Sequence, residues 1–178
     1  MMRKPQRPLR KGMLRDRSGA AAIEFAMIVP ILLMLVFATL EAGWIMVQSI
    51  MLDRALDTTV RSLRIGSFAN PTQETMRQRI CEEAWVLADC NNALALELFP
   101  INGGTGYPAD NIRCVNRSSP IAPVLRFTPG GRTQTMFVRA CFVVEPLTPG
   151  IGLGLALPKD ESGAFRIIAK SGFVNEPA

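Results

Sequence analysis

The apolar run from Ala20 to Leu40 constrains this chain more than any other feature of its sequence. Its only charged residue is Glu24, and no charge lies between Phe25 and Leu40. Twenty-one helical residues rising about 1.5 Å each span roughly 31 Å, which matches the hydrocarbon thickness of a bilayer. The run therefore predicts one transmembrane helix, with Glu41 and Trp44 at the far interface.

The segment before this run is strongly basic. Residues 1–17 hold seven basic side chains and one acidic one, whereas residues 18–178 hold 13 basic and 14 acidic groups. The net charge of +5 therefore comes from the N-terminal end. A basic flank beside an apolar run is typical of a cytoplasmic segment retained by the positive-inside rule. Nucleic-acid binding is disfavoured, because no aromatic residues interleave these charges.

A cleaved secretory signal is the alternative explanation for this run. Such signals have an apolar core of roughly 7–15 residues that is followed by small residues at the cleavage site. Here the apolar run is longer, and the small residues from Gly19 to Ala22 come before it. This order favours a signal that is cut at the cytoplasmic end of the run.

Residues 18–26 (Ser-Gly-Ala-Ala-Ala-Ile-Glu-Phe-Ala) and 29–33 (Val-Pro-Ile-Leu-Leu) resemble the N-terminus of the TadE-like family, the pseudopilins of tight-adherence (Flp-type) pilus systems. In that family a prepilin peptidase cuts after the glycine on the cytoplasmic side. The resemblance implies that Gly19 precedes the cut and that Ala20 becomes the new N-terminus. It also implies that Glu24 and Phe25 form the acidic-aromatic pair of the processing signal.

Elementary chemistry gives these residues a rationale. Glycine before the cut permits any backbone conformation and presents no side chain to a protease at the membrane surface. Cleavage creates an amino group at Ala20, and Glu24 can pair with it, or with the amino group of a neighbouring subunit, in an apolar environment. The alternative is that Glu24 only favours the positive end of the helix dipole, an effect of about 0.3–1 kcal/mol.

The helix is expected to continue beyond the membrane to about Ile65 as a stalk, with Gly66 as its stop. Apolar residues recur at helical spacing along this part of the chain: Leu52, Leu56, Val60 and Leu63. The stripe suits either a stalk that packs on other subunits or a helix that packs on its own domain.

The remaining chain predicts a small α+β domain with one helix and an antiparallel sheet. Asn70 is expected to cap a helix that starts at Pro71, runs to about Ala88 and presents an apolar face of Met76, Ile80, Ala84 and Leu87. Strands are expected at 93–99, 124–127, 134–145 and 165–174, and irregular loops at 101–110 and 117–123. In the third strand, one face is expected to carry Met136, Val138, Ala140, Phe142 and Val144.

All four cysteines lie beyond the apolar run, as expected for disulfides in an oxidising periplasm: Cys81, Cys90, Cys114 and Cys141. Three connectivities are open. We favour Cys81 with Cys90 and Cys114 with Cys141, because the first pair closes a short loop where the second helix ends. A metal site is disfavoured, since the chain has no C-x-x-C pair and no histidine.

Catalysis and cofactor binding find little support in the sequence. Without histidine, the chain cannot form Ser-His or Cys-His catalytic pairs. The acidic residues outside the apolar run are expected to lie on solvated faces. The G-x-G-x-G at residues 150–154 does not match a dinucleotide site, in which the third glycine stands three positions after the second and a helix follows. We expect a flexible apolar loop there, which either tucks under the sheet or offers a docking surface to another subunit.

The sequence thus predicts a basic cytoplasmic leader (1–19), a transmembrane and stalk helix (20–65) and a periplasmic domain (66–178) of pseudopilin-like type. The resemblance implies a minor pilin or pseudopilin of the inner membrane, with a prepilin peptidase, other pilins and the pilus assembly platform as partners. The residues themselves predict no enzyme activity, cofactor, metal or small-molecule substrate. The alternatives are an uncleaved single-pass scaffold of the same apparatus and a membrane-anchored periplasmic hydrolase.

Overall fold

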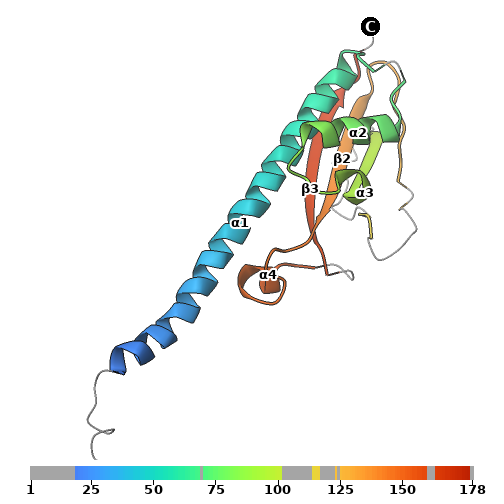
Figure 1. Ribbon diagram of the computed structural model, residues 1–178. Coiled ribbons are helices and arrows are strands. Elements are labelled where there is room, and N and C mark those ends of the chain that lie inside the picture. Colours follow the sequence, from blue (N-terminus) through green and yellow to red (C-terminus); the bar gives the residue numbers. More distant parts are fainter. Residues whose placement is uncertain are drawn as a thin grey trace, which may run out of the picture.

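The computed structural model describes residues 19–68, 70–101, 114–116, 123, 125–159 and 163–176. It confirms an α+β fold, in which a long helix carries a small unit of helices and strands near its C-terminal end (Figure 1). The elements are α1 (Ala20–Arg64), α2 (Gln73–Glu83), α3 (Cys90–Ala93), β1 (Leu94–Pro100), β2 (Thr135–Val144), α4 (Gly152–Ala156) and β3 (Phe165–Val174). The two irregular loops expected at 101–110 and 117–123 lie almost entirely outside the described residues.

Helix α1 runs without interruption through the predicted membrane segment and beyond it. It ends where the sequence predicts, because Gly66 adopts a left-handed conformation with φ 72°. The Gly66 N–H donates to the Leu63 carbonyl (3.1 Å) and the Ser67 N–H to the Ser62 carbonyl (3.0 Å). This pair of bonds is the Schellman motif, which satisfies carbonyls that the helix end would otherwise leave unpaired.

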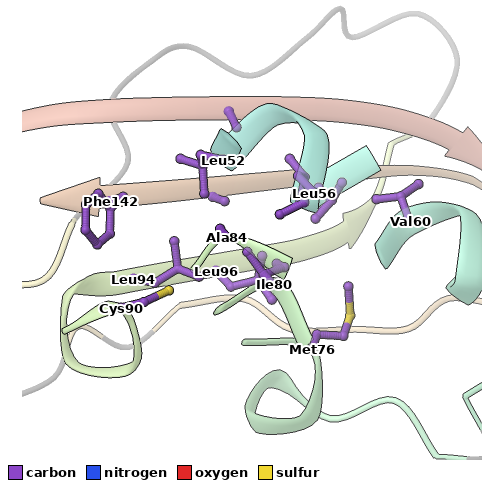
Figure 2. Packing of buried hydrophobic residues seen from close by; sticks show 14 of the residues in the cluster. Leu52, Leu56, Val60, Met76, Ile80, Ala84, Cys90, Leu94, Leu96 and Phe142 are labelled. Atoms are coloured by element: carbon purple, nitrogen blue, oxygen red, sulfur yellow. The ribbon is translucent and has the colours of Figure 1, made fainter. Parts of the chain in front are cut away.

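The predicted apolar stripe of α1 packs on the chain's own domain. Leu52, Leu56 and Val60 are buried against α2 and the sheet, in one core with Ile80 and Leu96 (Figure 2). Burial of each such side chain stabilises by about 1.5–3 kcal/mol. The stripe therefore fastens the domain to the C-terminal half of α1.

Helix α2 differs from the prediction at both ends. Its N-cap is Thr72 and not Asn70, because Thr72 and Thr75 form a reciprocal capping box. It ends at Glu83 and not at Ala88. The expected apolar face is nevertheless correct, since all four of its members are buried: Met76, Ile80, Ala84 and Leu87.

The disulfide between Cys81 and Cys90 explains the early end of α2. Nine residues of continuous helix would separate the two Cα atoms by roughly 13 Å, whereas they lie 5.6 Å apart. The chain instead turns back after Ala84, with Asp89 in the left-handed conformation (φ 52°). A longer helix is therefore incompatible with the bridge that the sequence also favours.

The sheet is antiparallel, in the order β1-β2-β3. Alternate residues of β2 face α1 and α2 and belong to the main core, as the sequence predicts: Met136, Val138, Ala140, Phe142 and Val144. On the opposite face, Cys141 packs with Ala95, Cys114, Leu125 and Ile168. Strand β2 is thus covered on both faces, which explains its nearly continuous burial.

The expected fourth strand at 124–127 is not found among the described residues. Phe127 forms only an isolated bridge with Leu98 in β1, in which the Leu98 N–H donates to the Arg126 carbonyl (2.9 Å). Pro129 lacks an N–H, and Gly130 turns the chain with φ 74°, so the pairing cannot extend. The described sheet therefore has three strands.

Candidate functional site

The N-terminal end of α1 presents the residues that the sequence singles out for processing. Gly19 directly precedes the helix and is exposed, and, its chain neighbours aside, no atom of the described residues lies within 4 Å of the place where a Cβ would stand. Its carbonyl accepts a hydrogen bond from the Ile23 N–H (3.2 Å). The bond between Gly19 and Ala20 therefore lies at the junction between the helix and the segment before it.

Glu24 lies one helical turn beyond Ala20 and is exposed, as is its neighbour Phe25. The first turn of α1 contains no acidic residue, and the dipole effect falls off within that turn, so the dipole explanation of Glu24 loses support. The sequence has no lysine or arginine between residues 18 and 53. A cationic partner for Glu24 must therefore come from a terminal amino group, the basic leader or another chain.

The N-terminal half of α1 exposes an apolar surface on all sides. Between Ile23 and Leu40, twelve large apolar side chains are 41–70% exposed. This is the one helix in the described part of the chain that is long and apolar enough to cross a membrane, and no residue of its most apolar stretch is buried. Such a surface suggests membrane anchoring by a single N-terminal helix.

The apolar loop that contains the glycines at 150–154 packs against α1 and does not cover a face of the sheet. It contains α4, which contacts α1 beyond the end of the strands (Figure 1). A Cβ placed on Gly152 would lie 3.7 Å from the Met34 carbonyl oxygen and 3.8 Å from Ala38 Cβ. The sequence left open whether this loop packs on the sheet or offers a docking surface to another subunit. The first alternative is wrong, because the loop packs on α1.

Glu41 joins α1 to this segment. Its side chain is 1% exposed, although the sequence predicts an interfacial position for it. Its carboxylate accepts hydrogen bonds from the Thr148 hydroxyl and, at 3.4 Å, from the Thr148 N–H. Gly154 leaves room for this contact, because its Cβ would lie 3.0 Å from Glu41 Oε1.

A second, largely buried carboxylate lies on the outer face of the sheet. Glu97 and Arg139 stand directly opposite each other on β1 and β2, with Arg139 Nη2 2.6 Å from Glu97 Oε2. The guanidinium also lies 5.8 Å from the centre of the Phe137 ring. The expectation of a solvated Glu97 is therefore wrong, and the pair is a structural contact inside the sheet.

Both favoured disulfides are present. Cys81 bonds to Cys90 and Cys114 bonds to Cys141. The first fixes the turn after α2, and the second holds residues 114–116 to the middle of β2. Bridges of this kind are typical of proteins in oxidising compartments.

One acidic group outside the apolar run is perturbed. Burial raises the pKa of the Asp53 carboxyl above its usual value, and the negative charge of Asp57 one turn further on raises it again. Within the described ranges, no cluster of three or more candidate metal ligands surrounds this or any other acid. Its raised pKa therefore reflects partial burial on α1 first and the neighbouring carboxylate of Asp57 second.

The comparisons with known proteins bear on α1. Residues 19–61 match the family model of TadE-like proteins. The match confirms the resemblance drawn from the sequence and covers α1 almost entirely, from Gly19 to Arg61. It supports a role related to tight-adherence pili, in association with pilus assembly components and a membrane. Comparison with curated proteins and with solved structures returned no significant match.

The sequence did not predict the contact between Glu41 and Thr148. The two residues are 107 positions apart, and no local pattern connects them. One signal was available, because Thr148 is the only residue with a polar side chain between Pro146 and Pro158. A lone hydroxyl in an apolar segment calls for a partner when it is buried.

Proposed function

We propose that this chain is a minor pilin or pseudopilin of a tight-adherence apparatus, and that a prepilin peptidase cuts it between Gly19 and Ala20. Its N-terminus faces the cytoplasm, α1 crosses the inner membrane, and the disulfide-bonded domain lies in the periplasm. The chain assembles with other subunits and carries out no catalysis. The observation that carries this proposal is the family match, which begins at Gly19, the residue directly before the exposed apolar helix.

Glu24 has a specific role in this proposal. Once the leader is removed, the new amino group of Ala20 lies one turn from the Glu24 carboxylate, or meets that of a neighbouring subunit. Pairing of opposite charges lowers the cost of bringing both groups into an apolar environment. The absence of lysine and arginine between residues 18 and 53 supports this role, because no side chain of the helix itself can neutralise Glu24 there.

Apolar side chains beyond the predicted membrane segment support lateral assembly. Met46, Val47 and Ile50 are exposed on α1, away from the side that packs on the domain. Their spacing places them on one face of the helix. Such a stripe can pack against the apolar helices of partner subunits, which is the stalk role that the sequence leaves open.

The cleavage is tested by N-terminal sequencing of the protein isolated from its native host, with and without the peptidase gene. We expect a mature chain that begins at Ala20 when the peptidase is present and an intact Met1 end when it is absent. Gly19→Leu should block processing, whereas Gly43→Leu is the matched control, because a Cβ at either glycine meets no atom within 4 Å. An intact Met1 end in wild-type cells would favour the uncleaved scaffold.

The pairing role of Glu24 is tested separately. Glu24→Gln keeps the size of the side chain and removes its charge, so we expect normal membrane insertion but loss of co-purification with partner pilins. Glu24→Asp keeps the charge and should retain most of the assembly. Normal piliation in the Glu24→Gln strain would contradict the pairing role.

A further inference from the structure

The segment from Pro146 to Pro158 has an unusual composition for a loop of a water-exposed domain. It carries no charged residue, and Glu145 and Lys159 flank it on either side. Three of its thirteen residues are proline and three are glycine. Loops at the surface of soluble domains are normally rich in polar residues, so this composition indicates a different environment.

The segment lies at the level of the apolar run of α1. Gly152 approaches Met34 and Ala38, which precede Leu40, the last residue of that run, by six and two positions. At about 1.5 Å per residue these positions are roughly 9 Å and 3 Å inside the end of the run. Interfacial segments of membrane proteins are buried by about 5–10 Å into the headgroup and acyl boundary. The mean of the two depths, about 6 Å, falls in that range.

Three of the five large apolar side chains of the segment are exposed. Leu147, Ile151 and Leu155 are 60%, 48% and 65% exposed, although they stand beside a sheet whose core is well buried. Neighbouring Met34 and Phe37 on α1 are also about half exposed. The apolar surface of the segment is thus continuous with the surface of α1 that suggests membrane anchoring.

Several polar groups of the segment are satisfied within the protein, as a membrane environment requires. Thr148 donates to Glu41, and the Leu157 N–H donates to the Leu153 carbonyl (3.0 Å). Lys159 Nζ donates to the Pro149 carbonyl (2.9 Å). The prolines have no N–H to satisfy. The lysine stands at the end of the segment, where its ammonium group can reach lipid headgroups.

From these observations we propose that the segment 146–158 is a second membrane contact. It enters the membrane leaflet on the side of the sheet, where α1 leaves the bilayer. Its side chains Leu147, Ile151 and Leu155 contact lipid. The Glu41 carboxylate holds it against α1. With two points of attachment, the domain has a fixed height and orientation above the bilayer. This inference rests on membrane anchoring by α1 and does not depend on cleavage or on pilus assembly.

The test uses the full-length protein in phosphatidylcholine liposomes. Leu155→Cys introduces a single free thiol, because the four native cysteines are bridged. An environment-sensitive nitrobenzoxadiazole dye on this thiol is then exposed to lipids with nitroxide groups on the upper acyl chain and, separately, to aqueous iodide. Val174→Cys is the matched control, since Val174 is an equally apolar, 47% exposed residue at the opposite end of β3. Leu35→Cys on α1 is the reference for an anchored helix.

We expect the dye at residue 155 to be quenched several-fold more by the nitroxide lipids than the dye at residue 174, and to be protected from iodide. Equal iodide quenching at both positions would overturn the proposal. Protection from iodide without nitroxide quenching would also overturn it, because a second protein chain would then cover the segment. Absence of nitroxide quenching at residue 35 would refute the anchoring by α1 itself, which separates that failure from a failure of the segment alone.

Discussion

The Glu41 carboxylate accepts two hydrogen bonds from Thr148, one from its hydroxyl and one from its backbone N–H. Glu41 belongs to the long helix and Thr148 to the connection between β2 and β3. This contact ties the segment 146–158 to the helix at the point where the apolar run ends. Because hydrogen bonds to charged groups are stronger than neutral ones, the contact is well suited to hold an otherwise apolar segment in place.

Removal of this carboxylate should loosen the segment. In Glu41→Ala, the Thr148 N–H loses its acceptor, and the Thr148 hydroxyl keeps only the Ile151 carbonyl (3.3 Å). An unsatisfied buried polar group costs about 1–3 kcal/mol. We expect faster hydrogen exchange in a peptide covering residues 146–158, measured by mass spectrometry in detergent. Glu24→Ala is the control, because Glu24 is exposed on the same helix. Unchanged exchange in Glu41→Ala would show that the contact does not hold the segment.

The close approach around Gly154 gives a second prediction. A Cβ on Gly154 would collide with the Thr148 carbonyl oxygen and crowd Glu41, so Gly154→Ala must displace the backbone. We expect a loss of about 1–3 kcal/mol in the stability of this segment, seen as faster local proteolysis. Gly150→Ala is the matched control, because its Cβ would meet no atom within 4 Å. Equal proteolysis of both variants would contradict the packing described for Gly154.

Local patterns predicted the parts of the fold that depend on local interactions. The helix from Ala20 and the strand from Phe165 to Val174 follow from long apolar or alternating runs. The end of α2 did not follow, because a constraint from outside the helix overrides its propensity. The bridge between Cys81 and Cys90 requires a turn, and the helical pattern up to Ala88 could not reveal it.

The candidate sites also differ in whether their residues are close together in the sequence. The motif around Gly19 that we propose as a processing signal is contiguous in sequence, so the residues alone could suggest it, and the family match begins there. The contacts of Glu41 and Glu97 join residues 107 and 42 positions apart. Only the tertiary fold brings such residues together, and a solvated acid and a buried one look alike in sequence.

The two disulfides should contribute unequally to stability. They close loops of 9 and 27 residues, and the loop-entropy relation gives about 2.5 and about 3.5 kcal/mol. We therefore expect Cys114→Ser/Cys141→Ser to lower the urea midpoint more than Cys81→Ser/Cys90→Ser. Thiol labelling of the denatured wild-type protein without reductant should detect no free thiol. A larger loss for the shorter loop would indicate that native-state contacts, and not loop entropy, dominate.

Asp53 provides a prediction about pH. Because its pKa is raised in the folded state, the ionised carboxylate destabilises the fold, and this penalty grows as pH rises above the usual aspartate pKa of about 3.9. Asp53→Asn should therefore raise the melting temperature at pH 7 but not at pH 3. Asp57→Asn removes only the weaker cause and should give a smaller gain. A gain of equal size at both pH values would exclude an electrostatic origin.

The buried pair of Glu97 and Arg139 should respond differently to single and double replacement. The two side chains are 12% and 5% exposed. Arg139→Leu removes the guanidinium that is bonded to Glu97 and leaves this largely buried carboxylate without its ion pair, at a cost of about 3–5 kcal/mol. We expect Arg139→Leu to lower the free energy of unfolding by that order, and the double variant Glu97→Leu/Arg139→Leu to recover much of the loss.

The pair of Arg64 and Glu176 is the internal control for this effect. Its side chains are 52% and 63% exposed, and exposed pairs contribute only about 0–1 kcal/mol. Glu176→Gln should therefore leave the urea midpoint nearly unchanged. If Arg139→Leu proved as mild as Glu176→Gln, the Glu97 carboxylate would be reaching water, and the outer face of the sheet would be more open than its burial indicates. A double variant no more stable than Arg139→Leu would mean that Arg139 stabilises the sheet mainly through its packing on Phe137.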